Sequence, residues 1–141
     1  MGASYWTYRG KFDGDPMKTL HEIRERIFLE RDYLWEEDEP HPASVEELMA
    51  NEMTQECGTH SALDVSRFIA ADDPDDFGTI RPLTSAQLIA AFGTEDPTIA
   101  DYEREQNADL LYLAPRWSAT CALLYENGTA VELALWGISG D

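Results

Sequence analysis

Residues 120–136, TCALLYENGTAVELALW, form two apolar runs joined by Asn127 and Gly128. Asn-Gly is a preferred pair for the two-residue turn of a hairpin, because both turn positions require a positive φ. Apolar runs on either side of such a pair are typical of paired strands. The stretch therefore predicts a β-hairpin at the carboxyl end of the chain.

Residues 4–12 form a second segment with strand character, at the other end of the chain. Trp6, Tyr8 and Phe12 occupy even positions within it, and aromatic side chains on one face indicate a strand with one buried side. We expect this strand to join the same sheet as the hairpin.

Capping residues and apolar stripes predict the helices. Asp15 before Pro16 starts the first one, because an Asp side chain accepts hydrogen bonds from first-turn amides and proline tolerates the first helical position. This helix is expected to extend to about Tyr33, and its apolar stripe consists of Leu20, Ile23, Ile27 and Leu34. Further helices are expected over residues 45–53 after the pair Ser44 and Glu47, between the pair Thr84 and Gln87 and the stop at Gly93, and from Asp96 to about Gln106.

The order of these elements indicates the fold class. Residues 61–69 alternate in polarity, which slightly favours one more strand over a helix. Strands at both ends with helices between them are typical of an α+β fold rather than of regular βαβ alternation. At 141 residues we expect a single domain over residues 1–141, with a small antiparallel sheet and a C-terminal hairpin packed against three to four helices.

The net charge of −18 is unevenly distributed along the chain. Residues 1–31 carry six basic and five acidic side chains, whereas the remaining residues carry four basic and twenty-three acidic ones. A negative field of this size repels nucleic acid and anionic membranes, and it accelerates encounter with a basic protein. We therefore expect a basic protein partner, with no nucleic acid and no membrane; acidity that only provides solubility is the alternative.

The sequence carries no signal for membrane insertion or export. No stretch approaches the roughly eighteen unbroken apolar residues of a membrane span, and the first residues lack a basic segment followed by an apolar run. Cys57 and Cys121 are too few for a disulfide scaffold and fit a reducing compartment. These features predict a cytoplasmic protein.

Several short motifs resemble those of a known family. They are YWTYR (residues 5–9), LHEIRERIF (20–28), GTHSALD (58–64), FGTIRPL (77–83), FGT (92–94) and WGIS (136–139). Together they resemble a family of small acidic proteins, mostly from actinobacteria, that has no assigned activity. The resemblance implies a bacterial, intracellular accessory protein and transfers no catalytic residue. In general character the chain is also similar to immunity proteins, which neutralise a partner toxin.

Cys57, His60 and Asp64 are the residues best suited to chemistry. If the fold brings them together, they have the residue types of a nucleophile, a base and an orienting acid. Cys57 and His60 also have the two-residue gap of half a zinc site, but only distant side chains could complete it. The structural interpretation is a small buried cysteine and a loop histidine. We expect no catalytic residue, no metal and no cofactor.

Two acidic runs are the candidate partner-binding residues, together with the tryptophan before the first run. They are Trp35 with Glu36, Glu37, Asp38 and Glu39, and then Asp72, Asp73, Asp75 and Asp76. Each run is either a solvated loop or a patch that presents carboxylates to Arg and Lys side chains of a partner. The second run lacks the spacing of an EF-hand and does not predict a calcium site.

Trp35 has two interpretations. A large aromatic side chain surrounded by acidic residues is typical of an interface hot spot, whereas the alternative is that Trp35 closes the first helix on the core. Trp6 and Trp136 lie in predicted strands, and we expect both in the core.

These features favour non-enzymatic binding by an inhibitor or immunity-type protein. Its acidic runs would cover a basic active site or a nucleic-acid-binding groove of a partner. One alternative is a small-ligand or metal-dependent enzyme that uses Cys57, His60 and Asp64. The other is a structural module that self-associates through a sheet edge. The oligomeric state stays open.

Overall fold

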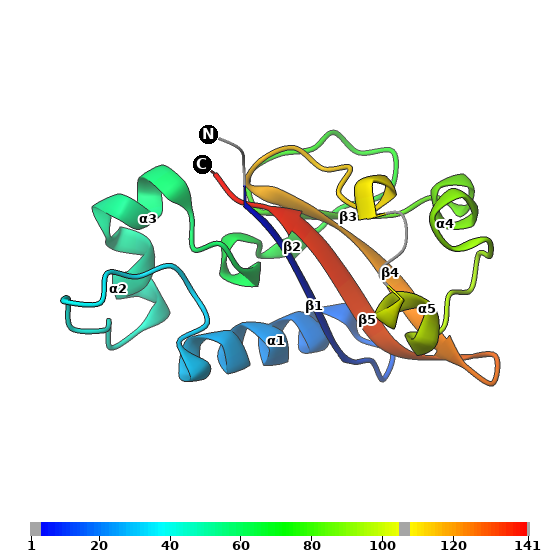
Figure 1. Cartoon of the computed structure of the whole chain (residues 1–141), viewed down its shortest axis with the longest axis horizontal. Helices are drawn as coiled ribbons and strands as arrows, with labels where there is room; N and C mark the ends of the chain where they lie inside the picture. Colours follow the sequence, from blue (N-terminus) through cyan, green and yellow to red (C-terminus); the bar gives the residue numbers. More distant parts are fainter. Residues whose placement is uncertain (1–3, 105–107, 141) are drawn as a thin grey trace.

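The C-terminal hairpin lies at the centre of a five-stranded mixed sheet in the computed structural model, which describes residues 4–104 and 108–140. The strands are β1 (Tyr5–Lys11), β2 (Arg67–Phe68), β3 (Thr79–Pro82), β4 (Ser118–Glu126) and β5 (Thr129–Ile138). In the order β1-β5-β4-β3-β2, β5 is antiparallel to β1 and β4, and β3 is parallel to β4 and β2 (Figure 1). Asn127 and Gly128 turn the hairpin with φ of 52° and 79°. The predicted hairpin is confirmed.

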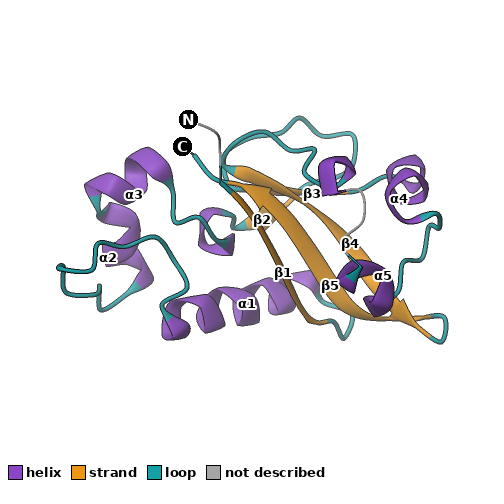
Figure 2. Cartoon of the chain, in the orientation of Figure 1, coloured by secondary structure: helices purple, strands orange, loops and turns teal. Residues whose placement is uncertain are grey.

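Helices accompany the sheet, so the α+β class is confirmed. They are α1 (Pro16–Glu30), α2 (Val45–Ala50), α3 (Glu52–Cys57), α4 (Ser85–Phe92) and α5 (Ile99–Glu103), with the 3-10 turns η1 (Ala62–Asp64) and η2 (Ala108–Leu110). Figures 1 and 2 show α2 and α3 at one end of the molecule and α4 and α5 at the other. Within the described ranges, no helix is long and apolar enough to cross a membrane.

Alternating side chains of the hairpin strands contribute to two separate cores. Cys121 and Leu135 belong to the core that α1 covers, whereas Leu124 and Trp136 belong to the core beside α4 and α5. This division follows from the period of two in a strand, which turns successive side chains to opposite faces. Trp6 and Trp136 are 5% and 3% exposed, so their predicted place in the core is confirmed.

Helix boundaries differ from the predictions where a single residue leaves helical geometry. The Asp15 side chain caps α1 as expected, but the helix ends at Glu30 rather than near Tyr33, because Arg31 adopts a left-handed φ of 57°. The pair at Thr84 caps α4 with both reciprocal hydrogen bonds. The last helix starts at a cap on residue 98 instead of residue 96, and its predicted end at 106 lies outside the described residues.

The helix predicted over residues 45–53 is two helices. Asn51 takes an extended ψ of 137°, and its side chain accepts hydrogen bonds from the backbone N–H groups of Met53 and Thr54 at 3.0 and 3.4 Å. An Asn side chain that caps in this way competes with continuation of the preceding helix. The result is α3, whose residues line both hollows described below.

The strand predicted over residues 61–69 is wrong for most of its length. The chain forms η1 there, and β2 contains only Arg67 and Phe68. The Arg24 guanidinium on α1 donates to the carbonyl oxygens of residues 62, 63 and 65. Sheet pairing would need these oxygens, so a side chain from a distant part of the chain decides the local conformation.

Candidate functional site

Trp35 lies in the loop after α1, where other aromatic rings hold its indole. The ring stacks on His41 at a centroid distance of 6.1 Å and meets the edge of Tyr33 at 6.2 Å. Its Nε1–H donates to the carbonyl oxygen of Glu39 at 3.2 Å. Trp35 is half-buried and packs against the α1-side core. Trp35 therefore covers the core with one part of its side chain and leaves another part exposed to solvent.

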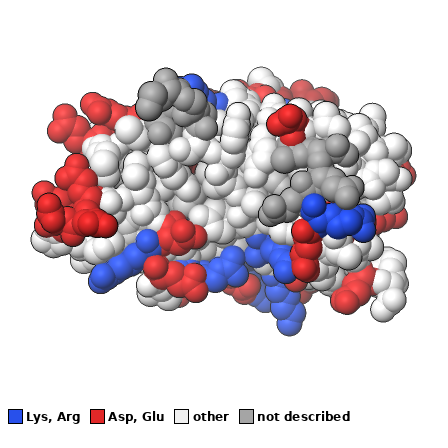
Figure 3. All heavy atoms as spheres, in the orientation of Figure 1, with Lys and Arg blue, Asp and Glu red and all other residues white. Residues whose placement is uncertain are grey.

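A hollow of about 290 Å³ opens beside Trp35, and we call it the acidic hollow. It is lined by Trp35, Glu36, Glu39, Asn51, Glu52 and Met53. The first acidic run supplies two of its carboxylates and α3 supplies the third. Figure 3 shows acidic side chains gathered at the end of the molecule that carries α2 and α3. An aromatic ring beside several carboxylates suits a cationic group.

No cation of the described residues compensates these carboxylates. Glu36, Glu39 and Glu52 are exposed, and none of them forms an ion pair with a Lys, Arg or His side chain of the described residues. The same holds for Glu37 and Asp38 within these residues. Their charge is therefore available to a partner.

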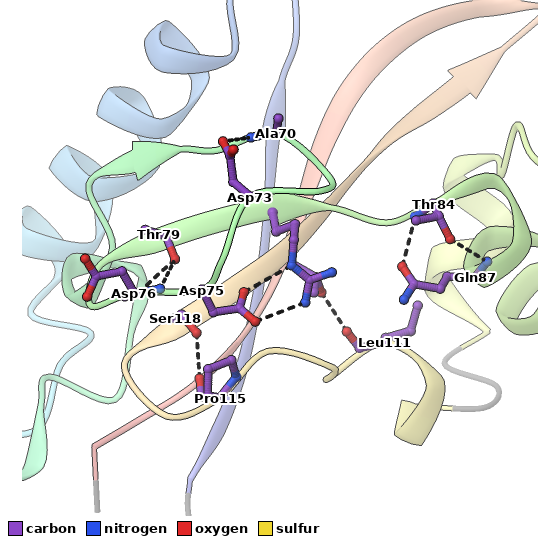
Figure 4. A network of polar contacts seen from close by, with 12 residues as sticks. Ala70, Asp73, Asp75, Asp76, Thr79, Thr84, Gln87, Leu111, Pro115 and Ser118 are labelled. Atoms are coloured by element: carbon purple, nitrogen blue, oxygen red, sulfur yellow. Dashed lines mark hydrogen bonds and ion pairs between the residues drawn. The ribbon is translucent and has the colours of Figure 1, made fainter.

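Most carboxylates of the second acidic run form hydrogen bonds or ion pairs with other groups of the same chain. Asp75 accepts two hydrogen bonds of 3.1 and 3.4 Å from Arg81 of β3 (Figure 4). Asp76 pairs with a second arginine at 3.3 Å, Asp73 accepts a backbone N–H of its own loop at 2.9 Å, and Asp72 is exposed. Figure 1 shows this loop, between β2 and β3, well apart from the loop that follows α1. The structure does not bring the two runs into one hollow.

Cys57, His60 and Asp64 are near one another in sequence but do not show the geometry of a catalytic triad. Asp64 Oδ1 accepts the backbone N–H of Thr59 at 2.7 Å, and Oδ2 is buried without a hydrogen-bond partner in the part of the chain that the structure describes. A triad acid instead orients its base by a hydrogen bond to the imidazole. Burial raises the pKa of the Asp64 carboxyl, and the hydrogen bond from Thr59 opposes that shift.

The remaining candidate ligands for a metal are scattered. Across residues 4–104 and 108–140, no three His, Cys, Asp or Glu side chains are grouped so that they could hold a metal ion. Burial raises the pKa of the Cys121 thiol to about 12, so the thiol is protonated at neutral pH. Cys121 is therefore a small buried hydrophobic residue, as expected, whereas Cys57 is only half-buried.

A second hollow, of about 240 Å³, was missed by the sequence patterns, and we call it the apolar hollow. It is lined by Met49, Thr54, Gln55, Phe77 and Trp117. These residues come from α2, α3 and the segments that precede β3 and β4. No local spacing connects positions this far apart, because only the tertiary fold brings them together.

Comparison with protein-family models, with curated proteins and with solved structures finds no match to this chain. No residue role is therefore transferred from a relative.

Proposed function

We propose that the chain is a non-enzymatic cytoplasmic binding protein, of the inhibitor or immunity type, that masks a basic site of a protein partner. The acidic hollow holds an arginine or lysine side chain of that partner. The observation that supports the proposal is an aromatic ring held beside three carboxylates that no cation of the described residues compensates.

The chemistry of the hollow explains how a cation is held. A guanidinium or ammonium group against an indole gains about 0.5–2 kcal/mol, more as water is removed. Glu36, Glu39 and Glu52 supply charge-assisted hydrogen bonds around it. Contacts with Tyr33 and His41 already order the Trp35 ring, so little conformational freedom is lost on binding.

The rest of the acidic surface acts at longer range. A net charge of −18 attracts a basic partner and raises the association rate, and salt screens this effect over about 10 Å. The second acidic run contributes to this field, while its internal hydrogen bonds leave it less suited to direct contact.

The proposal is tested by capture and then by affinity. The immobilised protein is exposed to a lysate of the cells that produce it, at about 50 and about 300 mM NaCl, and retained proteins are identified by mass spectrometry. The partner is then purified, and its Kd and its own activity are measured with the wild type and with Trp35→Ala. We expect one basic partner, inhibited on binding, with a Kd at least about tenfold weaker for Trp35→Ala.

A matched pair of charge variants distinguishes direct contact in the acidic hollow from the long-range electrostatic attraction of the whole chain. The first triple variant, Glu36→Gln/Glu39→Gln/Glu52→Gln, removes the three negative charges of the acidic hollow. The second, Asp72→Asn/Asp96→Asn/Glu126→Gln, removes three negative charges from exposed positions elsewhere. The first triple variant should weaken binding at least about tenfold, and the second should mainly slow association. Equal effects of both triple variants, or binding indifferent to salt and to Trp35, would overturn the proposal.

A further inference from the structure

The apolar hollow is built around a tryptophan in a restricted backbone conformation. Trp117 has φ of 70°, a region that bulky residues rarely adopt. Its N–H donates to the carbonyl of Ile138 at 2.9 Å, and its carbonyl accepts the N–H of Gly78 at 2.8 Å. These two hydrogen bonds to neighbouring segments hold the backbone in place and so fix the direction of the Trp117 Cα–Cβ bond.

Two glycines leave the space that the Trp117 ring occupies. A β-carbon on Gly140 would lie 2.0 Å from Cζ2 of the ring, and one on Gly58 would lie 3.2 Å from Cζ3. The ring is thereby fixed between two backbone segments. Phe77 stands beside it, with ring centroids 5.9 Å apart at an angle of 54°, and Phe77 is 69% exposed. A large exposed aromatic side chain next to a fixed ring is typical of a contact surface.

Thr54 of the apolar hollow carries a buried hydroxyl group. Thr54 lines the hollow and is only 1% exposed, yet its Oγ1 has no hydrogen-bond partner within residues 4–104 and 108–140. A buried polar atom without a partner costs about 1–3 kcal/mol. A backbone N–H or carbonyl group of a bound segment that reaches this hydroxyl removes that cost.

Both hollows border α3. Glu52 and Met53 line the acidic hollow, whereas Thr54 and Gln55 line the apolar one. At about 3.6 residues per turn, successive side chains diverge by about 100°, so Met53 and Thr54 point to different sides of the helix. A helix with its side chains is up to about 12 Å across, and an extended chain covers about 3.3 Å per residue, so roughly four residues of a partner span its width.

We propose that one segment of the basic partner uses both hollows. Its cationic side chain enters the acidic hollow, and a bulky apolar side chain about four residues away enters the apolar hollow between Phe77 and Trp117. The charge of the acidic hollow selects a basic segment, and the apolar hollow selects among basic segments. This inference rests on the proposed function, because it assigns the second contact of the same partner.

Two synthetic peptides test the inference directly. One carries an arginine and a phenylalanine four residues apart, and its matched control has alanine in place of the phenylalanine. The indole N–H signals of Trp35 and Trp117 in ¹H–¹⁵N spectra report the two hollows separately. We expect both peptides to shift the Trp35 signal, only the phenylalanine peptide to shift the Trp117 signal, and that peptide to bind about tenfold more tightly.

Variants of two exposed apolar residues provide the control. Phe77→Ala should abolish the difference between the peptides without changing the affinity of the alanine peptide. Leu29→Ala, at a position 71% exposed on α1, should leave both affinities unchanged. Shifts at Trp35 with none at Trp117, or a peptide difference that survives Phe77→Ala, overturn this inference and leave the acidic hollow supported. A shift at Trp117 with none at Trp35 overturns the proposed function and, with it, the shared segment.

Discussion

Trp6 and Gly137 face each other across β1 and β5, and the indole fills the space where a side chain at 137 would stand. A β-carbon on Gly137 would lie 1.9 Å from Cζ2 of Trp6. Gly137→Ala should therefore lower the free energy of unfolding by about 2–3 kcal/mol, because the ring is buried and cannot move aside without repacking. Urea denaturation measures the loss.

A double-mutant cycle identifies the cause of that loss. In a Trp6→Leu background the smaller side chain leaves room for the methyl group, so Gly137→Ala should cost less there than in the wild type. Additive effects of the two substitutions would show that the indole is not the obstacle.

Arg24 anchors the segment that was expected to be a strand. Arg24→Met keeps the aliphatic part of the side chain but removes the donors to the carbonyls of residues 62, 63 and 65. We expect the free energy of unfolding to fall by about 2–3 kcal/mol, because these acceptors lose a charged donor. Arg31→Met, at an exposed position after the same helix, should change it by less than about 0.5 kcal/mol. Similar losses for both variants would contradict the anchoring role.

Asp64 should make stability depend on pH in the direction opposite to that of an ion-paired carboxylate. Burial raises its pKa above the ordinary 3.8, although Thr59, His60 and Arg24 oppose the shift. The folded chain thus binds this proton more tightly than the unfolded chain. The stabilisation that the protonated carboxyl provides is fully present below pH 3.8, the ordinary pKa of the carboxyl in the unfolded chain. It is lost as the pH rises through the higher pKa of the folded chain.

Asp64→Asn tests this dependence, because the amide oxygen can still accept the Thr59 N–H. Relative to the wild type, the variant should gain about 1 kcal/mol at pH 7, where the buried charge is removed, and should gain less near pH 4. Unfolding curves at both pH values give the difference. An equal gain in the free energy of unfolding at both pH values would show that ionisation of Asp64 is not involved.

Asp75 should matter for stability rather than for partner binding. Its contact with Arg81, whose side chain is 14% exposed, orders the loop between β2 and β3. Asp75→Asn should lower the free energy of unfolding by about 0.5–1 kcal/mol and leave the Kd for the basic partner within about twofold. Glu39→Gln should show the reverse pattern. A strong effect of Asp75→Asn on affinity would place the second run in the contact.

Local signals in the sequence were sufficient where a few adjacent residues determine the conformation. The Asn127-Gly128 turn, the caps at Asp15 and Thr84 and the stop at Gly93 all take the predicted geometry. The errors arose where a local preference was weak. Alternation at residues 61–69 was overridden by hydrogen bonds from α1, and the cap at residue 51 divided a helix.

The sequence by itself determined the α+β class, the hairpin and a strongly acidic surface, because these follow from neighbouring residues and from composition. Only the tertiary structure decided that the two acidic runs have different roles. Arg81 on β3 pairs with Asp75 of the second run, while the first run and Glu52 of α3 meet around Trp35, where no cation of the described residues pairs with them. The apolar hollow also depends on tertiary packing, since Thr54, Phe77 and Trp117 become neighbours only when distant segments pack together.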